Sequence, residues 1–283
     1  MTRFSVSIPP FGTFGDPHVM VDLAVTAERA GWHGFFIWDH IQLGPWAGPV
    51  VDPWITLAAA AAATERIRIG PMVTPLPRRR PSKLARETVT LDHLSGGRLV
   101  LGVGIGWPPA EDFGAFGDAE DNAVRAAQLD EGLEVLTSLW SGATLEHRGE
   151  HYTAVNARFL PTPIQEPRIP IWVGGMWPHR GAFRRAARWD GVVPIAVDEG
   201  YEMADLDPAT FAEIVAYVRE RREDDLPFDA VASGMLLDDP VRAPEVLGAF
   251  EEAGMTWWME NIGWPPGLPV DHWRDLIGAG PPR

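Results

Sequence analysis

The chain has 283 residues, of which 46% are hydrophobic and 22% charged. These values are typical of a soluble globular protein and unlike long disorder, collagen or coiled coil. The formal net charge is −15 at pH 7, from 24 basic and 39 acidic residues, and so acidic a surface disfavours nucleic-acid binding because it repels a phosphate backbone. The absence of cysteine excludes disulfides, zinc–thiolate sites, iron–sulfur clusters and cysteine nucleophiles.

The N-terminal residues, MTRFSVSIPPFG, lack a basic stretch followed by an apolar run of signal-peptide length. The longest apolar run, 54–63, is about half of a membrane span. We therefore expect a cytoplasmic protein that does not associate with membranes.

Short apolar runs that predict buried strands alternate with helical patterns along the whole chain. The expected strands cover 4–8, 35–38, 66–73, 98–103, 171–173, 191–195, 230–235 and 256–260. The helices that follow them cover 17–30, 54–64, 81–94, 122–140, 179–188, 208–222, 243–253 and 270–277. Such alternation indicates a parallel sheet. Eight units can close into a single-domain (β/α)₈ TIM barrel over residues 1–283, which we favour over an open doubly wound sheet.

Residues 141–168 do not fit this alternation, because they contain Gly, Pro, Tyr and His between the fourth helix and the fifth strand. They predict an irregular or hairpin insertion. The insertion follows a helix, so it starts from the face opposite the catalytic rim of a barrel. We expect it to have a structural or interface role.

Asp39 and His40 directly follow the second predicted strand. In a barrel this position belongs to the rim that carries chemistry, and histidine is the side chain best able to exchange protons near neutral pH. The structural alternative is a polar strand end that caps the next loop.

The third and fourth strands end in residues that bring backbone close to a ligand. Prolines at 71 and 75 predict a bulge or strand end in the third. Gly102, Gly104 and Gly106 follow the fourth, but Trp107 stands where a dinucleotide fingerprint needs its third glycine. The fingerprint therefore fails, although glycines here still allow a flat ligand to approach.

Gly174 and Gly175 follow the fifth strand and precede an arginine-rich helical stretch. Glycine amides that lead toward a helix N-terminus form an anion site, so we expect them to bind a phosphate. The structural alternative is a plain tight turn.

Three further features of the sequence could have a function or only a structural role. His147 and His151 match a zinc-protease spacing, but Gly149 breaks the helix that this motif needs. The basic triplet 78–80 is expected to be a solvated loop or else a clamp for an anionic tail. Most tryptophans belong to the core, but four at one rim would suit a planar apolar ligand, and these are Trp38, Trp107, Trp177 and Trp264.

Four stretches of the chain resemble the luciferase-like monooxygenases, and within them the branch that uses the deazaflavin coenzyme F420. They are AGWHGFFIWDH (30–40), TPLPRRRP (74–81), LSGGRLVLGVG (94–104) and PIWVGG (170–175). They occur in the family's order, and the similarity covers most of the chain, more weakly in its last quarter.

The resemblance implies a barrel that holds a flavin or deazaflavin at its C-terminal rim. It implies that a cis non-proline peptide, matched here to Pro71–Met72, supports the back face of the ring. It assigns His40 to proton transfer and Asp39 to orienting His40 or the cofactor. The remaining cofactor contacts that it implies are Thr74 and Gly104–Gly106 near the ring or ribityl chain, and Gly174 and Gly175 at the phosphate.

We therefore expect hydride transfer between coenzyme F420 and a small, apolar organic substrate. The sugar-phosphate dehydrogenases of this family have a glutamate where Trp107 stands, which is a reason to expect an apolar substrate. The alternative is an FMN-dependent monooxygenase that uses reduced flavin and oxygen. A homodimer is expected, and a separate reductase is a candidate partner.

Two readings from other classes stay open. A metal-dependent barrel hydrolase could use Asp39 and His40, although the sequence has no H-x-H pair at a strand end. A flavin-binding relative without catalytic activity would bind cofactor but show no turnover.

Overall fold

The computed structural model describes residues 1–197, 203–204, 206–263 and 267–282. Its main sheet consists of β1 (Arg3–Ile8), β2 (Gly34–Ile37), β3 (Arg68–Pro71), β4 (Thr74–Pro75), β5 (Leu101–Gly104), β8 (Ile171–Trp177), β9 (Gly191–Val197), β10 (Met203–Ala204), β11 (Asp229–Gly234) and β12 (Trp257–Asn261). The helices are α1 (Pro17–Arg29), α2 (Pro53–Ala63), α3 (Pro81–Ser95), α4 (Pro109–Asp112), α5 (Asn122–Trp140), α6 (Arg180–Ala186), α7 (Pro208–Arg219), α8 (Ala243–Glu252) and α9 (Val270–Gly278). Four short 3₁₀ turns lie at Gly12–Phe14, Pro45–Ala47, Leu76–Arg78 and Gly114–Phe116.

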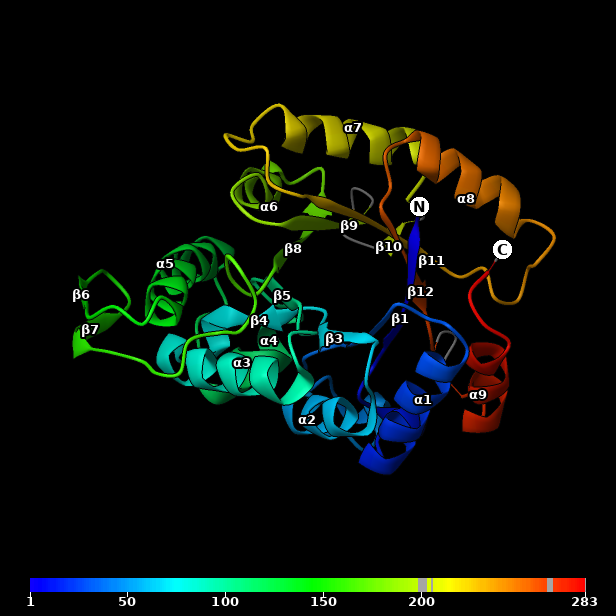
Figure 1. Cartoon of the computed structure of the whole chain (residues 1–283), viewed down its shortest axis with the longest axis horizontal. Helices are drawn as coiled ribbons and strands as arrows, with labels where there is room; N and C mark the ends of the chain where they lie inside the picture. Colours follow the sequence, from blue (N-terminus) through cyan, green and yellow to red (C-terminus); the bar gives the residue numbers. More distant parts are fainter. Residues whose placement is uncertain (198–202, 205, 264–266, 283) are drawn as a thin grey trace.

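The strands form a closed ring with the helices outside it (Figure 1). Hydrogen-bonded neighbours follow the order β3-β2-β1-β12-β11-β9-β8-β5-β4, and β10 adds an antiparallel pair to β9. Strands β3 and β4 are consecutive parts of one barrel strand, and a parallel bridge between Ile69 and Leu99 joins this strand to the segment that leads into β5. The predicted (β/α)₈ barrel is therefore confirmed.

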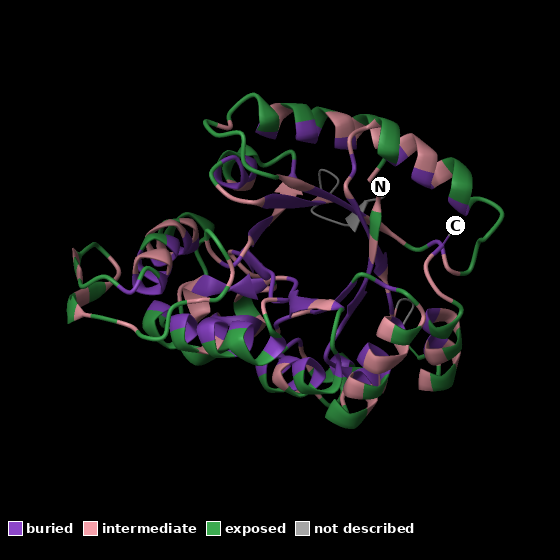
Figure 2. Ribbon diagram, viewed as in Figure 1, coloured by how far each residue is buried: buried purple, intermediate pink, exposed green. Residues whose placement is uncertain are grey.

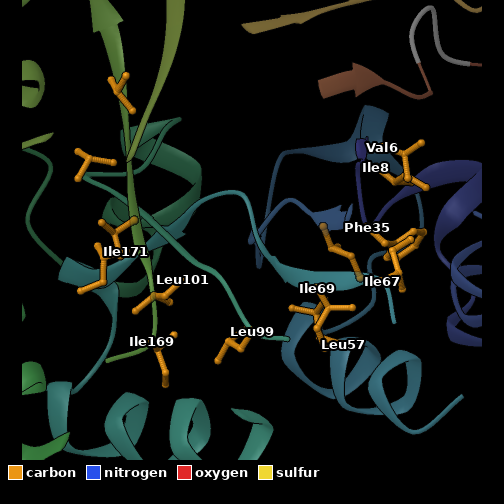
Figure 3. Packing of buried hydrophobic residues seen from close by; sticks show 14 of the residues in the cluster. Val6, Ile8, Phe35, Leu57, Ile67, Ile69, Leu99, Leu101, Ile169 and Ile171 are labelled. Carbon is orange, nitrogen blue, oxygen red and sulfur yellow. The ribbon is translucent and has the colours of Figure 1, made fainter. Parts of the chain in front are cut away.

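Two apolar layers hold the barrel together, and Figure 2 shows the buried residues concentrated along its strands. Residues that face the helices form the larger layer, which Figure 3 shows around Phe35, Ile69 and Leu101. A smaller cluster fills the inside of the barrel: Phe36, Met72, Val100, Trp172, Val193, Val231, Trp257 and Met259. Because both faces of the parallel strands are covered, most of the strands are apolar runs in the sequence, whereas β1 alternates apolar residues with the buried Ser5 and Ser7.

Aspartates fix the starts of several helices. Asp16, Asp52, Asp121 and Asp207 each accept a hydrogen bond from a backbone N–H in the first turn of the helix that follows. This arrangement satisfies donors that have no partner within the helix. Gly96 ends α3 in the left-handed conformation, with φ of 66°, which glycine adopts without steric cost.

The insertion is a hairpin of β6 (Leu145–Arg148) and β7 (Thr153–Ala157), as the sequence predicted. Glu131 of α5 anchors it, because its carboxylate pairs with the His147 ring and accepts hydrogen bonds from the His151 and Tyr152 amides. His147 lies on a strand, so the two histidines do not share the helix face that the zinc motif requires. An interface role for the hairpin stays a prediction.

Candidate functional site

The C-terminal ends of neighbouring strands bring most of the predicted site residues together. Asp39 and His40 follow β2, residues 72–74 lie between and within β3 and β4, and Gly104 ends β5. Pairing of β2 with β3, β4 with β5 and β5 with β8 places these ends side by side on one rim. Active sites of such barrels are built on this rim.

Asp39 is a buried anchor, 2% exposed. Its carboxylate accepts hydrogen bonds from Trp54 Nε1 at 2.9 Å and Thr74 Oγ1 at 2.7 Å. It also pairs with the guanidinium groups of Arg78 at 2.7 Å and Arg79 at 2.9 Å. Both Asp39 oxygens therefore have partners within the protein, and the fully buried Thr74 supports Asp39 with its hydroxyl.

The carboxylate beside His40 belongs to Asp112, at the end of α4. His40 Nδ1 lies 3.5 Å from Asp112 Oδ2, within ion-pair distance, but this buried nitrogen makes no hydrogen bond to any residue that the structure describes. Asp112 also accepts from the amides of Ile41 and Gln42 and pairs with Arg78. Burial acts to raise the pKa of Asp112, but the adjacent His40 ring and the Arg78 charge outweigh burial, so that this pKa is lowered. Asp112 therefore stays ionised beside the imidazole.

Arg78 connects the two aspartates, because its guanidinium contacts both Asp39 and Asp112. Its side chain is only 5% exposed, so the expectation of a solvated loop or an anion clamp is wrong for Arg78. Arg79 likewise pairs with Asp39, and only Arg80 of the triplet is exposed. Buried carboxylates need such partners to remain charged.

A cis non-proline peptide is present in the third barrel strand, one residue later than predicted. The bond is Met72–Val73, and the prediction of a cis Pro71–Met72 bond is wrong. Pro71 still pairs with Ile37 of β2, and the Met72 amide donates to the Ile37 carbonyl at 2.8 Å. The pairing with β2 therefore extends through the Pro71–Met72 peptide, and the irregularity begins after it.

Val73 lies close to both β5 and β8. A Cβ atom on Gly104 would lie 2.8 Å from Val73 Cγ2, and one on Gly174 would lie 2.9 Å from Val73 Cγ1. Such distances are too short for real contacts, so both strands need glycine here. The Val73 side chain thus packs against glycine backbone of β5 and β8, on the rim that also carries His40.

The loop after β5 is fixed by Arg125. This buried side chain donates to the carbonyl of Ile105 at 3.1 Å and to that of Gly106 at 2.8 Å. Gly106 has φ of 85°, and a Cβ there would lie 2.5 Å from the Phe113 ring. Only glycine fits both the conformation and the space.

Gly174 and Gly175 do not lead into a helix as predicted. They lie inside β8, opposite Val193 and Pro194 of β9, and β8 continues to Trp177 before α6 begins at Arg180. The sequence suggested a helix start because it does not reveal how far β9 extends the pairing. A Cβ on Gly175 would lie 2.3 Å from Ala182 Cβ, so this glycine also allows α6 to pack closely.

The four tryptophans differ in their surroundings. Trp38 donates to Ser7 Oγ at 2.9 Å and its ring centroid is 6.2 Å from that of His40. Trp107 is 57% exposed. Trp177 is only 8% exposed and packs edge-on against Phe183 and Tyr217, so it belongs to the core and we withdraw it from the expected pocket. Trp264 lies outside the described residues.

Asp112 and Arg78 are the site residues that the sequence interpretation missed. Asp112 lies shortly after Trp107, the position at which the resemblance implies an acidic group, and on the rim side of the glycine loop. An acidic residue at that position was therefore the feature of the sequence from which Asp112 could have been predicted.

Within residues 1–197, 203–204, 206–263 and 267–282, no three His, Asp or Glu side chains gather to hold a metal.

None of the helices that the structure describes is long and apolar enough to cross a bilayer.

Two curated relatives are named F420-dependent glucose-6-phosphate dehydrogenase. The chain is 31% identical to that of Microbacterium testaceum over 70% of its own length and 56% of the relative's. It is 34% identical to that of Nocardia farcinica over 62% and 51% of the two lengths. The chain thus spans about half the length of these relatives.

Solved structures confirm the fold. An F420-dependent secondary alcohol dehydrogenase in complex with an F420–acetone adduct superposes with a TM-score of 0.74 at 18% identity, and the match covers 98% of both chains. The oxygenating constituent of 3,6-diketocamphane monooxygenase from Pseudomonas putida, in complex with FMN, gives a TM-score of 0.67 at 18% identity, covering 90% and 80%. The family profile of the luciferase-like monooxygenases matches residues 2–237, so the chain belongs to the luciferase-like monooxygenase family.

Proposed function

We propose that this protein binds coenzyme F420 at the C-terminal rim and catalyses hydride transfer with a small, apolar organic substrate. The observation that carries the proposal is the pairing of His40 with an ionised Asp112 on the same rim as the Val73 surface. When bound, the deazaflavin supplies hydride transfer. The protein supplies a flat binding surface, shielding from water and a proton-transfer group.

The backbone at Gly104 and Gly174 and the side chain of Val73 would hold the ring. Gly104 and Gly174 leave room for the Val73 side chain, and Val73 would offer the ring an apolar contact. Gly106 extends this surface along the loop that Arg125 fixes. We still propose that the backbone of Gly175 contacts the phosphate. Because Gly175 lies inside β8 and not at the start of α6, the helix N-terminus does not add to this contact.

His40 is proposed as the proton-transfer residue. With Nδ1 directed to Asp112, the neutral ring carries its proton on Nδ1 and leaves Nε2 able to accept one. An alcohol substrate that loses hydride would release its hydroxyl proton to Nε2, and Asp112 would stabilise the resulting imidazolium. Arg78 and Asp39 hold Asp112 in place and do not contact the substrate in this scheme.

Trp38 and Trp107 are proposed to line the substrate pocket. Trp38 lies beside His40, and Trp107 follows the glycine loop with most of its indole available. Aromatic walls favour an apolar substrate over a sugar phosphate.

A titration followed by intrinsic tryptophan fluorescence tests the cofactor. We expect F420 to bind at least about tenfold more tightly than FMN, a difference of about 1.4 kcal/mol. Tighter binding of FMN, together with oxygen consumption in the presence of reduced FMN, would instead support the monooxygenase alternative.

The substrate class is tested by following the absorbance of oxidised F420. Small secondary alcohols should reduce it, and glucose 6-phosphate should not. Turnover with the sugar phosphate alone would contradict the apolar pocket. Binding of either cofactor without turnover on any substrate panel would support a non-catalytic role.

A further inference from the structure

A second candidate site lies at the N-terminal end of the barrel, away from the rim that carries His40. A hollow of about 630 Å³ opens there. Basic side chains and two indoles line it, and the residues that matter here are Arg3, Arg29, His33, Arg66, Arg68 and Trp257.

The sheet topology brings these residues together from distant parts of the sequence. Neighbouring strands β3, β2, β1 and β12 begin at this end. Arg3 pairs in register with Trp257, and Arg68 pairs with Gly34, the residue after His33. Arg29 ends α1 and lies at the same opening.

The arginines of the hollow have little local charge compensation. Arg29 and Arg68 form no ion pair with any residue that the structure describes, and Arg68 has only a 3.5 Å hydrogen bond to Gln165. Arg3 and Arg66 form long pairs, 3.7 Å to Asp229 and 3.9 Å to Glu65. Such exposed pairs contribute little to stability, so these guanidinium groups can bind another anion.

The one acidic side chain that lines the hollow is already engaged. The Glu28 carboxylate accepts hydrogen bonds from the backbone amides of Glu65, Arg66 and Ile67, at 2.6–3.1 Å. These amides fix the carboxylate in place, and although its charge acts on Arg66, Glu28 forms no ion pair with an arginine of the described part of the chain. The amides also hold the backbone that carries Arg66 and Arg68.

His33 adds a neutral donor. Its Nδ1 accepts a hydrogen bond from the Phe4 amide at 3.1 Å, so the neutral ring carries its proton on Nε2. Burial and then the charge of Arg3 lower the pKa of His33, and the same two causes lower the pKa of Arg68. Arg3 therefore lies close enough to act on both groups, and the charges of Asp229 and Asp92 partly offset its effect on Arg68.

We propose that this hollow binds a small soluble polyanion with two or more phosphate or carboxylate groups. Guanidinium groups recognise both by charge-assisted, bidentate hydrogen bonds. The Trp257 indole is fully buried beneath the hollow and supports Arg3, whose guanidinium carbon lies 5.2 Å over its ring. The site is independent of the proposed cofactor site at the opposite rim.

Calorimetric titration with inorganic pyrophosphate, and separately with citrate, tests the proposal at low ionic strength. At least one probe should bind with 1:1 stoichiometry, and 0.5 M salt should weaken that binding strongly. The double variant Arg29→Gln/Arg66→Gln should weaken it at least about tenfold. Both residues are exposed, so this variant is expected to fold.

The matched control is Arg148→Gln/Arg184→Gln, which removes the same charge from two exposed arginines elsewhere. It should change the affinity less than about twofold. Saturation with FMN or F420 should leave pyrophosphate binding unchanged. The proposal is overturned if neither probe binds, if both double variants weaken binding equally, or if the cofactor displaces pyrophosphate.

Discussion

His40 Nδ1 and Asp112 Oδ2 lie 3.5 Å apart, although the two residues follow different strands, β2 and β5. The carboxylate reaches the ring because α4 turns back over the rim, where the amides of Ile41 and Gln42 hold it. With Nδ1 facing Asp112, the Nε2 atom of His40 is the nitrogen left for a substrate. Substitutions of Asp112 and of His40 test this arrangement.

Asp112→Asn should lower turnover at least about tenfold while it changes cofactor affinity less than about threefold. The amide no longer stabilises a protonated imidazole, but the surface around Val73 is unchanged. Steady-state kinetics and fluorescence titration measure the two effects. In a His40→Ala background the same substitution should have almost no further effect on turnover, because Asp112 acts through His40. Additive effects would show that Asp112 acts by another route.

His40→Ala should keep cofactor binding within about tenfold and lower turnover by about 10²-fold or more. The reason is that the ring contacts proposed here come from Val73 and glycine backbone, while proton transfer depends on the imidazole. His93→Ala is a control on an exposed helix face of α3. Equal activity of His40→Ala and the parent protein would remove His40 from the mechanism.

Gly174→Ala should weaken cofactor binding at least about tenfold, because the new methyl group would lie 2.9 Å from Val73 Cγ1 and displace it. Gly181→Ala is the matched control, since nothing lies within 4 Å of a Cβ at that position. Fluorescence titration compares the two variants, and thermal unfolding checks that both are folded. Unchanged affinity in a folded Gly174→Ala protein would show that the ring is not bound at Val73.

The barrel strands and their order were predictable because each buried parallel strand is a short apolar run, ended by glycine, proline or aspartate. The runs at 4–8 and 35–38 became β1 and β2 almost residue for residue. Asp39 and His40 were found because their position at a strand end follows from the strand itself.

The contacts between loops were not predictable in the same way. Arg78 was interpreted as solvated because a basic triplet usually is, and the sequence does not show that Asp39 and Asp112 are buried on either side of it. The cis bond was misplaced by one residue because its position depends on where pairing with β2 ends. Both errors concern partners from different loops, which only the closed barrel brings together.

Asp112 also predicts a pH dependence of stability. Its pKa is lowered in the folded protein, so the folded state binds fewer protons than the unfolded state in the acidic range. The resulting stabilisation is present above the unfolded pKa of about 4 and is lost as the pH falls through the folded pKa.

Asp112→Asn should therefore reduce the free energy of unfolding by about 1–3 kcal/mol near pH 7, and this difference from the parent should shrink below about pH 4. Urea unfolding at pH 7, 5 and 3.5 measures it, with the exposed Asp118→Asn as control. A difference that stays constant to pH 3.5 would mean that the Asp112 charge does not stabilise the fold.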